Sequence, residues 1–112
     1  MWDIGADNPA EVIFAMPTYV IFFHLTHQGL DHLRGSPDRV DAAKKTFHQH
    51  GAKVKDFYSM MGQYDSMFIV EAPSDDVMAQ LALTVGAQGN VRTETHRAFS
   101  EDEYRKIVKA IP

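Results

Sequence analysis

The segment MGQYDSMFIVEAP, residues 61–73, decides how the chain folds, because it joins a turn to a strand that closes on a proline. The preceding segment AKVKDFYSM, residues 52–60, is also of strand composition. Together they predict two strands connected around Gly62, hence a β-hairpin. A tight hairpin needs only a pair such as Asn-Gly. The combination of Gly62, Tyr64 and Asp65 therefore indicates a longer, fixed turn.

This turn admits two interpretations. In the structural one, Gly62 supplies a positive φ, Tyr64 packs across the hairpin, and the Asp65 carboxylate accepts hydrogen bonds from turn amides. In the functional one, Tyr64 and Asp65 line the mouth of a pocket as a proton donor and a base. Both interpretations are compatible with the residues.

Two helices are predicted on either side of the hairpin. Ser-Pro-Asp at residues 36–38 predicts a helix start with Ser36 as N-cap, and Gly51 predicts its end. Ser74 predicts the start of a second helix of the same length, which ends at a glycine within residues 86–89. The equal lengths indicate an internal repeat of two similar halves.

The remaining segments are two strands and a terminal helix. Residues 18–25, TYVIFFHL, form a strand whose two faces are both apolar, which predicts cover on both sides. Residues 91–99 form a fourth strand, and Ser100 with Glu103 predicts a capping box that begins a C-terminal helix. The apolar side of this helix is predicted to dock on the fold; it comprises Tyr104, Ile107, Val108 and Ile111.

The predicted fold class is α+β, a ferredoxin-like βαββαβ arrangement with a C-terminal helix. Right-handed crossovers place the end of the first strand, the turn at residues 62–65 and the start of the fourth strand at one edge. A ten-residue segment, residues 26–35, is inserted at that edge and has no counterpart in the second half. Such insertions often carry function.

The third strand has apolar residues on both faces, with Met67 and Ile69 alternating with Phe68 and Val70. An uncovered face of this sheet would expose a large apolar patch, which monomers avoid. The sequence therefore predicts a homodimer or a higher homo-oligomer that packs sheet to sheet.

Bulk composition bounds the class of protein. A chain of 112 residues with 45% apolar side chains is one domain. Its net charge of -4 argues against a nucleic-acid partner, and no apolar run is long enough for a membrane span. The chain has no cysteine, which permits a reducing compartment, and the predicted location is cytoplasmic. Residues 1–15 are predicted to be a loosely held extension of a domain over residues 16–112.

Histidines and charged residues supply the remaining site candidates. His24 shares a strand face with Val20 and Phe22, either as a hydrogen-bonded core group or as a proton shuttle. His24 and His27 do not make a convincing metal pair, because strand positions three apart face opposite ways. Neither a metal nor a cofactor is predicted.

Arg92, Glu94 and His96 project from one face of the fourth strand. They form either a solvated edge with alternating charges or a functional group facing a dimer interface. In the second interpretation Arg92 holds an anionic ligand and Glu94 orients His96.

Four separated blocks of the sequence resemble the GYD domain family, named for its Gly-x-Tyr-Asp turn. The blocks are MPTYVIFFHLTHQG, SPDRV, GAKVKDFYSMMGQYDSMFIVEAPSDD and GAQGNVRTETHRAFSEDE, and the similarity spans residues 16–107. The resemblance implies a dimeric α+β barrel, in which two ferredoxin-like subunits pair through their sheets. That superfamily includes cofactor-free monooxygenases, isomerases, haem-handling proteins and proteins without known activity, so the resemblance implies a fold and leaves the chemistry open.

Three functions are compatible with these observations. The leading hypothesis is a small organic ligand bound between sheet and helices. The enzymatic alternative is a cofactor-independent monooxygenase or isomerase in which His24 or Asp65 moves a proton, with Tyr64 and His96 as further catalytic candidates. The third is a structural or assembly module without catalysis. The first two require a cavity with a polar group inside, and the third predicts a filled interior.

Overall fold

The computed structural model describes residues 16–112, so the predicted extension over residues 1–15 lies outside the described residues. The strands are β2 (Thr18–Leu25), β3 (Lys53–Ser59), β4 (Ser66–Glu71) and β5 (Val91–Ala98). The helices are α2 (His27–Asp31), the 3-10 helix η1 (Leu33–Gly35), α3 (Ser36–Gln49), α4 (Asp75–Ala87) and α5 (Glu101–Lys109).

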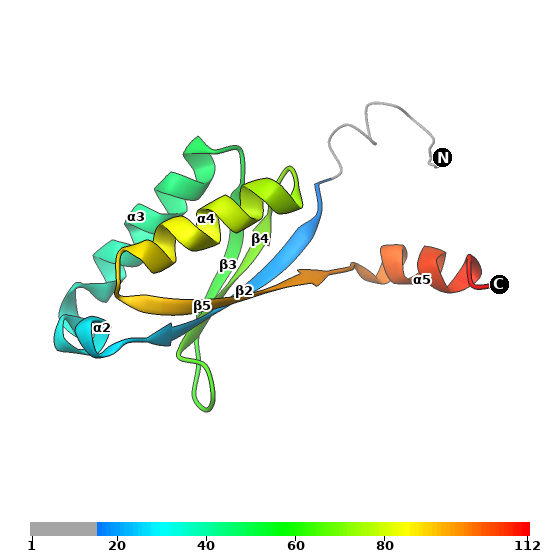
Figure 1. The fold of residues 1–112 in the computed structure, drawn as a ribbon. Coiled ribbons are helices and arrows are strands. Elements are labelled where there is room, and N and C mark those ends of the chain that lie inside the picture. The colour runs from blue at the N-terminus through cyan, green and yellow to red at the C-terminus, as the bar shows by residue number, and fades with distance from the viewer. Residues whose placement is uncertain (1–15) are drawn as a thin grey trace.

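The sheet has the order β3-β4-β2-β5, and every neighbouring pair is antiparallel. The two longest helices, α3 and α4, cover one face of the sheet (Figure 1). This arrangement confirms the predicted ferredoxin-like α+β fold. The central position of β2 means that both of its neighbours, β4 and β5, contribute side chains beside its own on each face.

The helix boundaries follow from local sequence rules with one exception. The Ser74 hydroxyl accepts a hydrogen bond from the Val77 amide at 3.3 Å, as an N-cap does. Gly51 adopts φ 81°, so it ends the preceding helix as predicted. Ser36, however, is not an N-cap, because η1 leads directly into α3 and Ser36 already has helical φ and ψ.

The core lies between the sheet and the two helices, with Phe68 of β4 at its centre. Phe68 contacts Phe23, Phe47 and Phe57 edge to face, with ring centroids 5.0, 5.6 and 5.9 Å apart. Edge-to-face contacts add about 0.5–1.5 kcal/mol each beyond area burial. The largest fully buried side chains are Phe47, Phe68, Ile21, Met78, Leu81 and Val70.

The second face of the sheet, which we call the open face, carries no helix of the described chain (Figure 1). Along β2 the buried residues alternate with half-buried ones, so Val20, Phe22 and His24 lie on the open face. Their partners in register on β4 include Met67 and Ile69. The cover predicted for both sides of β2 is therefore supplied on one side only within the described residues 16–112.

The C-terminal helix does not dock on the sheet or helices of residues 16–112, contrary to the sequence-based prediction. Figure 1 shows α5 continuing from the end of β5 away from the layers. None of its residues is buried; Tyr104 is 61% exposed, and Ile111, just after the helix, is 64% exposed. The capping box forms as predicted, with Ser100 and Glu103 bonding each other's backbone amides. Local rules thus make this helix without any packing of its apolar side.

Candidate functional site

The turn that opens the sequence argument connects β3 to β4 through residues 60–65. Gly62 adopts φ 103°, a conformation that glycine reaches readily and other residues rarely adopt. The Met60 amide donates to the Asp65 carbonyl at 2.9 Å and closes the turn. Apart from its chain neighbours, no atom of residues 16–112 lies within 4 Å of the place where a side chain at Gly62 would begin. Glycine is therefore needed at this position because of its positive φ, and not because a side chain would clash with a neighbour.

Asp65 ties this turn to the end of the central strand. Its amide donates to the Phe23 carbonyl at 2.9 Å, and its carboxylate Oδ2 accepts from the Leu25 amide at 2.8 Å. The Asp65 carboxylate thus accepts not from the expected turn amides but from the last amide of β2. The end of β2 lies beside Asp65, and the last amide of this strand needs an acceptor.

Asp65 also lines a cavity of about 160 Å³ between the sheet and the helices. Most of its wall is apolar and comes from the sheet, α3 and the end of α4. The polar lining residues are Ser36, Arg39, Ser59, Asp65, Ser66, Gln88 and Asn90. A cavity with a polar group, the condition for either ligand hypothesis, is present.

Tyr64, the preceding residue, lies on the open face. Its ring stacks on Phe22 with centroids 4.3 Å apart, and its hydroxyl donates to Glu94 Oε2 at 2.8 Å. His96 Nε2 lies 2.6 Å from the same oxygen. Tyr64 therefore packs against β2 and β5 and not across its own hairpin. We call Tyr64, Glu94 and His96 the open-face cluster.

Hydrogen bonding shifts two pKa values in the open-face cluster. The hydrogen bond with Glu94 raises the pKa of Tyr64, with burial and the glutamate charge adding to it. The contact with His96, followed by that with Tyr64, lowers the pKa of Glu94. The carboxylate is thus held in its charged form by two donors.

His24 and Arg92 lie at the end of the same face, opposite each other in register. The His24 ring is 4.9 Å from the Tyr64 ring, and the residue is half-buried, outside the core. Arg92 is exposed, and within residues 16–112 its side chain makes no hydrogen bond or ion pair. No group of three or more metal-ligating side chains gathers anywhere in the described part of the chain. The five predicted site residues thus lie on two sides of the sheet. Asp65 lines the cavity on the helical side, and the other four lie on the open face: His24, Tyr64, Arg92 and His96.

The inserted segment at residues 26–35 contains contacts that the sequence did not reveal. Thr26 Oγ1 donates to the Gly89 carbonyl at 2.6 Å, and the Gln28 side chain donates to Asn90 Oδ1 at 3.0 Å. A Cβ at Gly29 would lie 2.1 Å from the Asn90 carbonyl oxygen. Helix α2 is therefore held against the start of β5, at the edge where the cavity lies. The sequence indicated this contact only indirectly, through the position of Gly29 in a segment inserted at a strand end.

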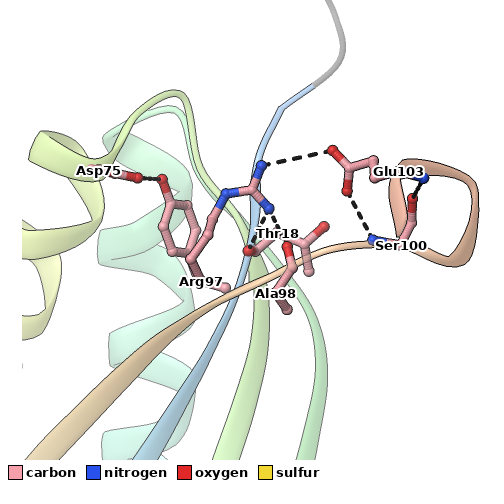
Figure 2. Close-up of polar contacts among 7 residues, drawn as sticks. Thr18, Asp75, Arg97, Ala98, Ser100 and Glu103 are labelled. Atoms are coloured by element: carbon pink, nitrogen blue, oxygen red, sulfur yellow. Dashed lines mark hydrogen bonds and ion pairs between the residues drawn. The ribbon is translucent and has the colours of Figure 1, made fainter. Parts of the chain in front are cut away.

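At the opposite end of the sheet, Arg97 joins β5 to α5 (Figure 2). Its guanidinium bonds to the carbonyls of Thr18 and Ala98 and lies 3.7 Å from the Glu103 carboxylate. It also lies over the Phe99 ring, 4.4 Å from the centroid. One side chain thus fixes the direction in which α5 leaves the sheet.

Comparison with known proteins shows one relative and a shared fold. The chain is 30% identical over 85 residues to the glutamine synthetase and cystathionine beta-lyase binding protein of Thermus thermophilus, covering 75% of this chain and 90% of that protein. Two structures from Mycobacterium tuberculosis share the fold. The leucine response regulatory protein LrpA is 18% identical with a TM-score of 0.55, covering 83% of this chain, and MtbAldR is 16% identical with a TM-score of 0.61, covering 90%. The chain spans 56% and 61% of the length of those two chains.

No helix in residues 16–112 is long and apolar enough to cross a membrane. The GYD domain model matches residues 19–108, which include the turn, the cavity and the open-face cluster. The chain therefore belongs to the GYD domain family, a family of dimeric α+β barrels.

Proposed function

We propose that this chain is a protein-binding module that assembles as a homodimer and offers its C-terminal helix to a metabolic enzyme. The observation that carries the proposal is the exposed apolar side of α5. Tyr104, Ile107 and Val108 are all exposed on a helix whose other side is charged, and Ile111, just after the helix, is exposed as well. A helix of this kind is suited to lie in an apolar groove of a partner.

The name of the Thermus relative supports an enzyme as the partner, since that protein is called a binding protein of glutamine synthetase and cystathionine beta-lyase. Partner enzymes of these two kinds are therefore the first to test. This function corresponds to the assembly alternative and requires no chemistry from the module itself.

The test is a binding titration with glutamine synthetase and cystathionine beta-lyase purified from the same organism. Ile107→Asp places a charge on the apolar side of α5 and should weaken binding at least about tenfold, because such a charge must be desolvated. Asp102→Lys, on the opposite side of the helix, is the matched control and should bind like the unmodified chain. Binding by neither enzyme, or equal loss in both variants, contradicts the proposal.

A second candidate function is binding of a small organic ligand, favoured by the cavity of about 160 Å³ between sheet and helices. Its mixture of apolar wall and a few polar groups is typical of ligand sites. The enzymatic alternative receives less support. Asp65 faces the cavity whereas His24 lies on the open face, so the two proton-moving candidates do not meet on one substrate within a chain.

A further inference from the structure

The cavity has one acidic and one basic lining residue, Asp65 and Arg39. Asp65 uses Oδ2 to accept from the Leu25 amide. Its second carboxylate oxygen carries no hydrogen bond within residues 16–112. A carboxylate oxygen without a donor has capacity for a further charge-assisted hydrogen bond.

The Arg39 guanidinium already donates hydrogen bonds to two backbone carbonyls of the inserted segment. Its Nη1 donates to the His32 carbonyl at 2.9 Å and its Nη2 to the Gly29 carbonyl at 3.5 Å. Both acceptors belong to α2 or its end, so the guanidinium holds the inserted segment against α3. Both terminal nitrogens of Arg39 thus already donate to the inserted segment, whereas one oxygen of Asp65 has no donor within residues 16–112, so the carboxylate is the better-placed anchor for a ligand.

Two serines of the sheet also line the cavity, and their hydroxyl oxygens can accept hydrogen bonds. Ser59 and Ser66 are directly opposite each other across β3 and β4, and both line the cavity. Ser66 also follows Asp65 in the chain. A donor group placed beside Asp65 would thus find additional oxygen acceptors.

The apolar part of the cavity sets the size of the ligand. Phe23, Val40, Phe57 and Val85 are among the residues that line it. A cavity of about 150 Å³ with an aliphatic and aromatic lining takes up benzene. The volume of about 160 Å³ therefore admits one group of that size.

We propose that this cavity binds a small primary amine, with its ammonium group on the unpaired carboxylate oxygen of Asp65 and an apolar group about the size of a benzene ring between the sheet and the helices. The inference rests on the second proposed function and adds the chemical class of its ligand. It is independent of whether α5 binds an enzyme.

The experiment compares three probes of similar shape, benzylamine, toluene and benzoate, by amide chemical-shift titration of the full chain at neutral pH. Benzylamine should bind at least about tenfold more tightly than toluene, because a charged hydrogen bond is added, and benzoate more weakly than either. Equal affinity for toluene and benzylamine, or tightest binding of benzoate, overturns the amine assignment while leaving ligand binding intact. No binding by any probe overturns ligand binding itself.

Two pairs of variants locate the site. Ala43→Leu fills the cavity from α3 and should abolish benzylamine binding, whereas Ala42→Leu on the exposed side of the same helix should not change it. Asp65→Asn keeps an acceptor for the Leu25 amide but removes the charge, so benzylamine should fall to the affinity of toluene. Thermal unfolding of each variant establishes that it folds. Unchanged preference for benzylamine in folded Asp65→Asn refutes the role of Asp65.

Discussion

Tyr64 and Asp65 are consecutive residues whose side chains lie on opposite faces of one sheet. Tyr64 contributes to the open-face cluster, and Asp65 supports the end of β2 and lines the cavity. The sequence indicated that this pair mattered, because a simple turn has no need of it. It did not reveal their partners, since Glu94 and Leu25 are 30 and 40 residues away along the chain. Such contacts depend on strand register, which only the folded sheet defines.

The ionisation of Glu94 provides a residue-scale prediction. His96→Ala should raise the Glu94 pKa more than Tyr64→Phe does, because the His96 contact is the larger cause of its depression. Since folding lowers this pKa, the stabilisation is present above the ordinary glutamate pKa and is lost as pH falls through the folded-state value. Carboxyl-carbon NMR titration of both variants measures the order. The reverse order would mean that the tyrosine is the main partner.

Tyr19 gives a second residue-scale prediction at alkaline pH. Burial, followed by the hydrogen bond to Asp75 (Figure 2), raises its pKa from 10.0 to about 12. The associated stabilisation is complete below pH 10 and is lost as pH rises through about 12. Tyrosinate absorbance should show a last ionisation step near pH 12 that disappears in Tyr19→Phe. Persistence of that step in the variant would assign it to another tyrosine.

At the scale of elements, the packing of α2 rests on Gly29. Gly29→Ala should destabilise the fold by about 1–3 kcal/mol, because the new methyl group meets the Asn90 carbonyl and the helix must move. Urea unfolding measures the change. Gly86→Ala is the matched control, since outside its own helix no atom of residues 16–112 lies within 4 Å of a Cβ at that position in α4, and it should stabilise by about 0.5–1 kcal/mol. A neutral Gly29→Ala would show that the contact between α2 and β5 is not tight.

Elements defined by local signals were predictable, and those defined by context were not. The Ser74 cap, the Gly51 stop and the capping box of α5 are all local and all present. The helices α2 and η1 were not predicted, because α2 has only five residues and depends on contacts with β5. Their presence also removes the capping role of Ser36. The docking of α5 was predicted from its apolar side alone, which cannot identify the surface that covers it.

At the scale of the molecule, the open face is the surface through which we propose that the chain dimerises. Ile69→Glu adds a charge at the centre of this face and should convert a dimer into a monomer in light scattering, since a buried unpaired charge is costly. Leu83→Glu on α4 is the control, because Leu83 is already 74% exposed on the helical side, and it should leave the mass unchanged. A monomeric unmodified chain, or a dimeric Ile69→Glu, would exclude pairing through this face.

The position of α5 also determines how readily this helix unfolds locally. Nine residues are fewer than the about 12–15 that an isolated helix needs to persist in water, and this helix has no buried residue to compensate. Its amide hydrogens should therefore exchange with solvent by local fraying, while those of β2 and β4 exchange only on global unfolding. Hydrogen-exchange mass spectrometry would then report a bound partner directly, as slowed exchange confined to residues 101–109.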